Sequence, residues 1–227
     1  MASTTLSLEV VMKSIVDEGF FGLKDSAIGE DILEMERKGF PYFSEYGLDF
    51  CKRHVLNERI LSIVESFFDD KICVLAHWLR YKAYPGHILC FRRGGPKAGR
   101  RALIVHLLPK GSLVSYCSGS HQHELPTTDG KRLLYEIPGS ALAEVGCKRE
   151  EEDFPDGGLA IFDARVGFEI KLGYAITFEF ATVDVVEKWP KMILPNTPKL
   201  AEKVADMERP KIRLNFEFRD STGGTNK

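Results

Sequence analysis

Residues 154–182 read FPDGGLAIFDARVGFEIKLGYAITFEFAT, and this stretch favours a β-sheet fold. Two runs rich in aromatic and β-branched residues, 159–162 and 174–182, flank a connection with polar edges. Glycines at 157, 158 and 173 let the backbone turn through φ > 0 without a Cβ clash. We therefore predict that the stretch forms the last hairpin of a β-barrel.

The chain on either side supplies the rest of such a barrel. Apolar spacing predicts helices before residue 70, short strands from residue 71, and a helix and an alternating strand at the end. The predicted helices are 7–18, 30–37, 56–68, 140–145 and 199–207, and the other predicted strands are 72–83, 87–91, 102–108, 113–117 and 211–219. This pattern predicts an α+β, mainly β fold, an antiparallel barrel or sandwich with N-terminal helices packed on one outer face.

We interpret residues 1–227 as a single domain with four parts. Residues 1–70 form a helical N-terminal layer, 71–189 the barrel core, 190–219 a C-terminal helix and edge strand, and 220–227 a disordered tail.

Composition limits the function classes. A net charge of −2 and a pI near 6.3 predict neither a nucleic-acid partner nor an anionic membrane surface. Five cysteines without CxxC spacing predict reduced thiols and a cytoplasmic protein. The first residues lack the pattern of a secretory signal, and no apolar run has the ~20 residues of a membrane span.

Two motifs resemble a known family. The run LVSYCSGSH at 113–121 and the run GGLAIFDARVGF at 157–168 resemble the phytanoyl-CoA dioxygenase-like proteins, and the similarity covers roughly residues 76–182. The resemblance implies the double-stranded β-helix (jelly-roll) fold of Fe(II)- and 2-oxoglutarate-dependent oxygenases. The chain also looks like a group of uncharacterised fungal proteins met in natural-product pathways.

The family's iron ligands do not carry over. Its H-x-D motif falls at 87–89, where His87 is followed by Leu89 at the carboxylate position, and its distal His falls at Phe168. The arginine that grips the co-substrate should lie near Glu179, where this chain has no basic residue. Leu and Phe have no lone pair to donate to iron, so the chain is predicted to be a degenerate member that binds no metal.

Several polar residues interrupt apolar strands. His106 is either a core histidine or a neutral acid/base on the barrel lining, since burial lowers the pKa of an imidazole. Asp163 and Arg165 form either a structural ion pair or a ligand site. The strand 174–182 has Thr177 and Glu179 on one face, and the sequence leaves open which face lines the barrel.

Two loops carry further candidates. His121 and His123 have the i, i+2 spacing with which a strand can chelate a metal, although solvated histidines are the more ordinary interpretation. Arginine pairs at 92–93 and 100–101 bracket the loop GGPKAG, which is either a phosphate- or carboxylate-binding turn or a solvated hairpin tip.

These observations lead to one main hypothesis. A barrel without metal ligands could hold an apolar natural-product intermediate and catalyse a cyclisation or isomerisation, of the Diels–Alder type among others, with no cofactor. The predicted site combines catalytic residues with residues that contact a small apolar substrate. The catalytic set is His106, Asp163 and Arg165, and the substrate-binding set is His87, Tyr116, Phe168 and Glu179.

Two alternatives remain open at this point. One is an oxygenase that uses Fe(II) and 2-oxoglutarate with a displaced ligand set drawn from the chain's histidines. The other is a barrel that binds a small molecule without turning it over. A homodimer through the outer helices or the edge strand is also open.

Overall fold

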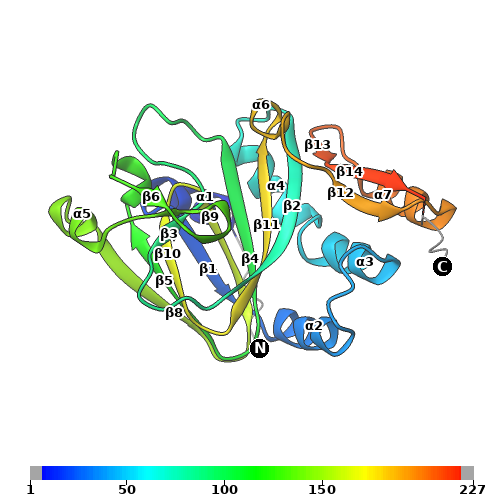
Figure 1. Ribbon diagram of the computed structural model, residues 1–227, viewed down its shortest axis with the longest axis horizontal. Coiled ribbons are helices and arrows are strands. Elements are labelled where there is room, and N and C mark those ends of the chain that lie inside the picture. Colours follow the sequence, from blue (N-terminus) through cyan, green and yellow to red (C-terminus); the bar gives the residue numbers. More distant parts are fainter. Residues whose placement is uncertain (1–6, 221–227) are drawn as a thin grey trace, which may run out of the picture.

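The computed structural model describes residues 7–220, which form two six-stranded sheets packed face to face with helices outside (Figure 1). The predicted jelly-roll architecture with outer helices is confirmed. All of the predicted tail except Asp220 lies outside the described residues. No helix of the described part is long and apolar enough to cross a membrane.

The first sheet is antiparallel except at its last strand, which runs parallel to its neighbour. In spatial order its strands are β1 (Phe20–Lys24), β9 (Gly158–Asp163), β4 (Ala102–Leu108), β11 (Tyr174–Thr182), β2 (Cys73–Lys82) and β13 (Ile212–Leu214).

The second sheet closes the barrel from the other side. In spatial order its strands are β6 (Thr128–Asp129), β7 (Tyr135–Glu136), β3 (Leu89–Cys90), β10 (Gly167–Leu172), β5 (Ser112–Ser118) and β8 (Lys148–Phe154). The strand β8, which carries the sequence KREEEDF, is the edge of this sheet and pairs only with β5 among the described strands.

Helices cover the outer face of the first sheet, on the right of Figure 1. The α-helices are α1 (Leu8–Asp17), α2 (Ser26–Arg37), α3 (Glu45–His54), α4 (Glu58–Phe67), α5 (Gly139–Glu144), α6 (Val183–Val186) and α7 (Pro198–Met207). Asn57 caps α4, because its side chain accepts a hydrogen bond from the Ile60 amide at 3.1 Å. The predicted helix 140–145 corresponds to α5, which packs on the outer face of the second sheet.

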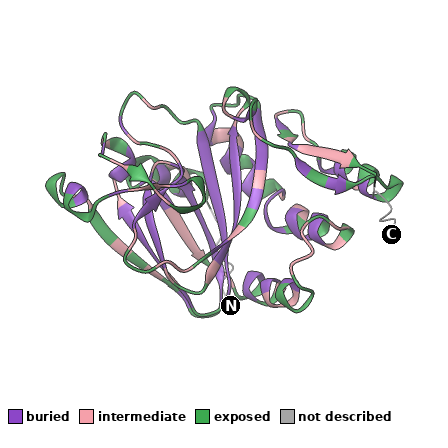
Figure 2. Cartoon of the chain, in the orientation of Figure 1, coloured by how far each residue is buried: buried purple, intermediate pink, exposed green. Residues whose placement is uncertain are grey.

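Side chains of the first sheet alternate between two cores, and Figure 2 shows its central strands β4 and β11 buried along almost their whole length. On β11, Ile176, Phe178 and Phe180 pack against the helices. Thr177 and Glu179, on the opposite face of the same strand, point into the barrel. The structure thus settles the question that the sequence left open about this strand.

The predicted hairpin of residues 154–182 is wrong. Strands β9 and β11 do not pair with each other, because β4 lies between them. The connection between them contains a strand of its own, β10, which belongs to the second sheet. Its inward residues Phe168 and Ile170 alternate with Glu169 and Lys171, which is the alternation expected of a strand. The sequence-based prediction did not include this strand.

Other elements also depart from the predictions. The strands β1 and β8 and the helix α3 were not predicted, and the first of these lies inside the supposedly helical layer. The predicted strand 211–219 is two strands, because Asn215 interrupts it and donates side-chain hydrogen bonds to the carbonyls of Ala76 and Pro190. Beyond this break β14 (Phe216–Arg219) pairs with β12 (Met192–Pro195) instead of β2.

Candidate functional site

The middle of the barrel is filled by side chains. His106 of β4 is fully buried, and its ring lies 4.6 Å from that of Phe162 and 5.3 Å from that of Phe168, centroid to centroid. Tyr116 packs 5.3 Å from Phe162, and its hydroxyl lies 3.5 Å from Nδ1 of His106. None of these four side chains lines any of the four main pockets of residues 7–220. The centre of the barrel is therefore a packed aromatic core.

This core occupies the place where the family resemblance puts iron. Leu89 pairs in register with Phe168, and the ring of Phe91 stacks on Phe168 with centroids 5.4 Å apart. All three side chains are hydrocarbon and buried in the barrel. Within the described residues no group of three His, Cys, Asp or Glu side chains could hold a metal ion. The residues at this position do not fit an iron centre.

A pocket of about 890 Å³ opens at the mouth of the barrel. Strands β2 and β11 form one wall, and the loop of residues 129–135 and the segment 189–193 form the others. Phe91 separates this pocket from the aromatic core, since it lines the pocket and also stacks on Phe168. Much of the lining is aromatic or aliphatic, and both tryptophans of the chain, Trp78 and Trp189, are part of it.

Glu179 is the buried acid of this mouth pocket. Its residue is only 2% exposed, and Oε1 accepts a hydrogen bond from Nη2 of Arg92 at 2.9 Å. Nε2 of His77 lies 3.4 Å from its other oxygen, Oε2. Burial raises the pKa of Glu179 to about 7, although the charge and hydrogen bond of Arg92 act to lower it. A carboxyl group with such a pKa exchanges its proton readily at neutral pH.

The two neighbours of Glu179 are fixed by an aromatic ring. The imidazole of His77 stacks on Trp189 at 5.3 Å, and the guanidinium of Arg92 lies over the same indole at 4.6 Å. Burial lowers the pKa of His77 to about 4, so its imidazole is neutral at pH 7. The site thus combines a titratable carboxyl, a neutral imidazole and a fixed cation.

Sequence reasoning found Glu179 but missed His77 and Trp189. His77 lies directly opposite Glu179 in the regular antiparallel register of β2 and β11, so both side chains lie on the same face of the sheet. The sequence alone did not show that these two strands pair. The nearest signal was the position of His77 in an otherwise apolar strand, which is the same argument that singled out His106.

The other predicted site residues lie elsewhere. His87 precedes β3, where its ring stacks on Tyr84 at 3.7 Å and its Nδ1 lies 2.7 Å from Oε1 of Glu136. Of the seven predicted residues, only Glu179 lines the mouth pocket. The predicted catalytic roles of His106, Asp163 and Arg165 and the predicted substrate contacts of His87, Tyr116 and Phe168 stay predictions.

Asp163 and Arg165 form a tight ion pair at the end of β9. Oδ1 of Asp163 accepts from the Arg165 amide at 2.9 Å and from its Nε at 2.8 Å, while Oδ2 accepts from Nη2 at 2.6 Å. The guanidinium also donates to the carbonyl of Gly95 at 3.3 Å. This geometry supports the structural interpretation of the pair, because the contacts with Asp163 tighten the turn between β9 and β10 and the contact with Gly95 ties that turn to a neighbouring loop.

The His121 and His123 pair does not lie on a strand. Residues Ser120–Gln122 form a short 3-10 helix, so the i, i+2 spacing does not bring the two imidazoles to one face. His121 is buried, and its Nε2 lies 3.2 Å from the carbonyl of Val16. The strand geometry assumed for a metal site at this position is wrong.

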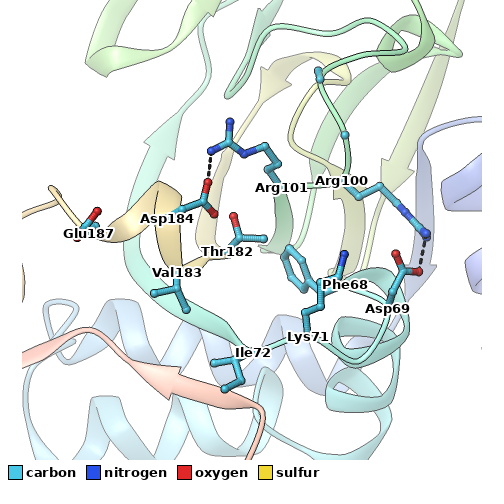
Figure 3. A pocket seen from close by; sticks show the side chains of 12 residues that line it. Phe68, Asp69, Lys71, Ile72, Arg100, Arg101, Thr182, Val183, Asp184 and Glu187 are labelled. Carbon is cyan, nitrogen blue, oxygen red and sulfur yellow. Dashed lines mark hydrogen bonds and ion pairs between the residues drawn. The ribbon is translucent and has the colours of Figure 1, made fainter.

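Another pocket, of about 870 Å³, lies outside the barrel next to α6 and is drawn in Figure 3. Its arginines are paired across the surface, Arg100 with Asp69 at 2.6 Å and Arg101 with Asp184. Both carboxylates are more than half exposed. Solvated ion pairs of this kind contribute little energy and hold no buried acid or base, so we assign the chemistry to the mouth pocket.

The burial of His106 predicts acid sensitivity. Burial lowers the pKa of His106 from 6.5 to about 3, so below pH 6.5 the unfolded chain binds a proton that the native protein does not. The stability that this residue contributes is complete above pH 6.5 and is lost as the pH falls towards 3. We expect His106→Gln to flatten the loss between pH 6.5 and 4.5 by about 2–3 kcal/mol, measured by urea denaturation at each pH.

His123→Gln is the matched control for this experiment, because His123 is only partly buried. In the control, the free energy of unfolding should fall with decreasing pH as steeply as in the unmodified protein. An unchanged slope in His106→Gln would mean that His106 is protonated in the native barrel.

Comparison with solved structures finds proteins with a similar fold. SnoN, an epimerase solved with Fe3+, alpha ketoglutarate and nogalamycin RO, matches with a TM-score of 0.55 at 13% identity, over 77% of this chain and 83% of that chain. HygX from Streptomyces hygroscopicus, with iron bound, matches with a TM-score of 0.52 at 15% identity, over 86% and 94%. AviO1 from Streptomyces viridochromogenes matches with a TM-score of 0.53 at 12% identity, over 80% and 97%.

At these identities the likeness shows the fold alone, the jelly roll that the 2-oxoglutarate-dependent enzymes use. No family model matches the chain, and no curated protein matches its sequence. The finer resemblance to the phytanoyl-CoA dioxygenase-like proteins stays a prediction.

Proposed function

We propose that the chain is an isomerase or cyclase that acts on an apolar small molecule in the mouth pocket and needs neither iron nor 2-oxoglutarate. Glu179 is the general base in this proposal: it removes a proton from one carbon of the substrate and returns it to another. Electrons and atoms balance within the substrate, so no oxidant or reductant takes part. A pericyclic cyclisation in the same pocket is the special case in which binding and orientation suffice.

The observation that carries the proposal is the position of Glu179, a buried carboxyl that lines an open pocket beside His77 and Arg92. A general base works best when its pKa lies near the working pH, and burial raises the pKa of this carboxyl to about 7. The residue lines a pocket that a substrate can enter, whereas His106 lies within the packed core. The neutral imidazole of His77 and the guanidinium of Arg92 stand beside it, and either could donate a hydrogen bond to a developing enolate oxygen.

The substrate class follows from the pocket walls and rim. Large apolar side chains that are more than a third exposed surround the opening, namely Phe43, Leu79, Leu133 and Ile193. Leu133 is 97% exposed at the tip of the loop beside β7. Apolar groups left in water next to a pocket are stabilised when an apolar ligand covers them, which supports an apolar substrate.

Two observations support independence from the family's cofactors. The iron position holds Leu89, Phe91 and Phe168, which offer no donor atoms. Glu179 stands where the resemblance expects the arginine that grips 2-oxoglutarate, and an ionised carboxylate there repels an anionic co-substrate. The epimerase SnoN supports the reaction class, since a protein with this fold performs an epimerisation, although it is named as alpha ketoglutarate-dependent.

The test uses protein treated exhaustively with EDTA. The protein is incubated, without added iron or 2-oxoglutarate, with a metabolite extract of cells from which its gene has been deleted. We expect one compound to disappear while an isomer of identical mass appears. Conversion that returns only with iron and 2-oxoglutarate, or a product heavier by an oxygen atom, would establish the oxygenase alternative instead. A compound that binds tightly and is never converted would establish the binding barrel.

Arg92 lowers the pKa of Glu179, which gives a prediction about the pH dependence of kcat/KM. The general base must be ionised, so kcat/KM should rise with pH around an apparent pKa near 7. Because the guanidinium lowers the pKa of Glu179, Arg92→Met should raise that pKa and move the rising limb to higher pH by about one unit. The measurement is kcat/KM against pH for both proteins. A shift to lower pH, or none, would show that Glu179 is not the titrating base.

A further inference from the structure

A second, smaller cavity adjoins the mouth pocket. It measures about 230 Å³ and shares Arg92 and Tyr135 with the larger pocket as lining residues. Four arginines line it, and none of its lining residues is acidic. The four are Arg92, Arg93, Arg101 and Arg165. We call it the arginine cavity.

The acids that pair with these arginines lie outside the arginine cavity. Glu179 holds Arg92 from the mouth pocket, Asp184 holds Arg101 from the outer pocket, and Asp163 binds Arg165 through its turn. Three of the four guanidinium groups are thus held by acids that do not line the cavity, and the cavity itself carries only cationic side chains and no carboxylate. This is the arrangement that an anion-binding site requires.

Two further observations point to a missing anion. Among the described residues, Arg93 forms no ion pair, and its guanidinium lies 4.9 Å from the ring centre of Tyr135. Nε of Arg92 is buried and has no hydrogen-bond partner in the described part of the chain. Buried N–H groups without a partner are rare, because leaving one unsatisfied costs free energy.

We propose that the arginine cavity binds a carboxylate or phosphate group of the substrate while the apolar part of the same molecule lies in the mouth pocket. The inference deepens the proposed function, since it rests on the mouth pocket as the substrate site. Tyr135 and Arg92 form the boundary between the apolar and the anionic ends. The substrate class is thus an amphiphilic acid, held at one end by guanidinium groups and exposed at the other to Glu179.

The test is a binding titration that needs no turnover. Both tryptophans line the mouth pocket, so intrinsic fluorescence reports its occupancy directly. The probes are decanoate, decyl phosphate and 1-decanol, which share one apolar chain and differ in the head group. We expect at least one of the two anions to bind about tenfold more tightly than the alcohol, and the tighter anion identifies the group. Equal affinity for all three would overturn the proposal.

Arg93→Gln tests whether the preference for anions arises in the arginine cavity. Arg93 pairs with no acid in the described residues, so its replacement leaves no carboxylate unpaired. We expect the variant to lose most of the tenfold preference and to keep its affinity for decanol. Arg59→Gln, at an exposed position on α4, is the matched control and should keep the preference. A preference that survives in Arg93→Gln would place the anion elsewhere and overturn the proposal.

Glu179→Gln separates this inference from the proposed function. The variant should retain or strengthen the preference for anions, since it removes a negative charge beside Arg92. Loss of the preference in this variant would contradict the arginine cavity, whatever happens to catalysis. An active Glu179→Gln enzyme with an intact preference would contradict only the catalytic role of Glu179.

Discussion

Glu179→Gln is expected to lower kcat by about 10²–10⁴-fold, the range that general acid–base catalysis contributes. Glutamine has the same size and can still accept a hydrogen bond from Arg92, but it cannot take up a proton from carbon. Ligand affinity, read from tryptophan fluorescence, should change by only a few fold. The measurements are single-turnover rates and binding titrations on the same preparations.

Glu169→Gln is the matched control. Glu169 is also a buried carboxylate of the barrel wall, and it pairs with Arg149 and accepts a hydrogen bond from the Gly86 amide at 2.6 Å. It lines none of the pockets found in the described residues, so its variant should keep kcat near that of the unmodified protein. Equal losses in both variants would indicate general damage to the barrel.

Phe162→Ala is expected to destabilise the fold by about 3–5 kcal/mol, the cost of truncating a phenylalanine in a packed core. The ring of Phe162 lies between those of His106, Tyr116 and Phe168, with centroid separations of 4.6, 5.3 and 5.5 Å. Its removal would open a cavity that these neighbours cannot close. Urea denaturation at pH 7 measures the change in the free energy of unfolding.

Phe43→Ala is the control for this experiment, since Phe43 is 37% exposed at the rim of the mouth pocket. It should cost about 1 kcal/mol or less. A small loss in Phe162→Ala as well would mean that the middle of the barrel is an open, ligand-sized space.

Phe162 also shows where sequence reasoning stops. Alternation along a strand tells which residues share a face, and for residues 174–182 it separated Thr177 and Glu179 from their apolar neighbours correctly. Whether an inward side chain lines a void or fills it depends on the volume supplied by the opposite sheet. For this reason the sequence left open whether His106 lies in a core or on a cavity lining, and in the structure Phe91 and Phe168 pack against its ring from the other sheet.

The mouth pocket could be predicted only in part, because it depends on contacts between residues far apart in the sequence. Glu179 could be predicted as an unusual acid in an apolar strand, and the arginines at 92–93 were noted as an anion-binding candidate. The contact between Arg92 and Glu179 could not be predicted, since 87 positions separate the two residues. The stack of His77 on Trp189 needs both the pairing of β2 with β11 and the course of the chain after β11. Neither has a local sequence signal.

The edge strand β8 has a consequence for self-association. An exposed edge normally invites another strand, and a second copy of β8 would be the natural candidate. In an antiparallel pair centred on Glu151, the acidic run of residues 150–152 would face itself across the new ladder. Like charges directly opposite each other repel, so this edge discourages homotypic sheet extension and fibril growth. The run of glutamates therefore protects this seven-residue edge strand electrostatically against pairing with a copy of itself.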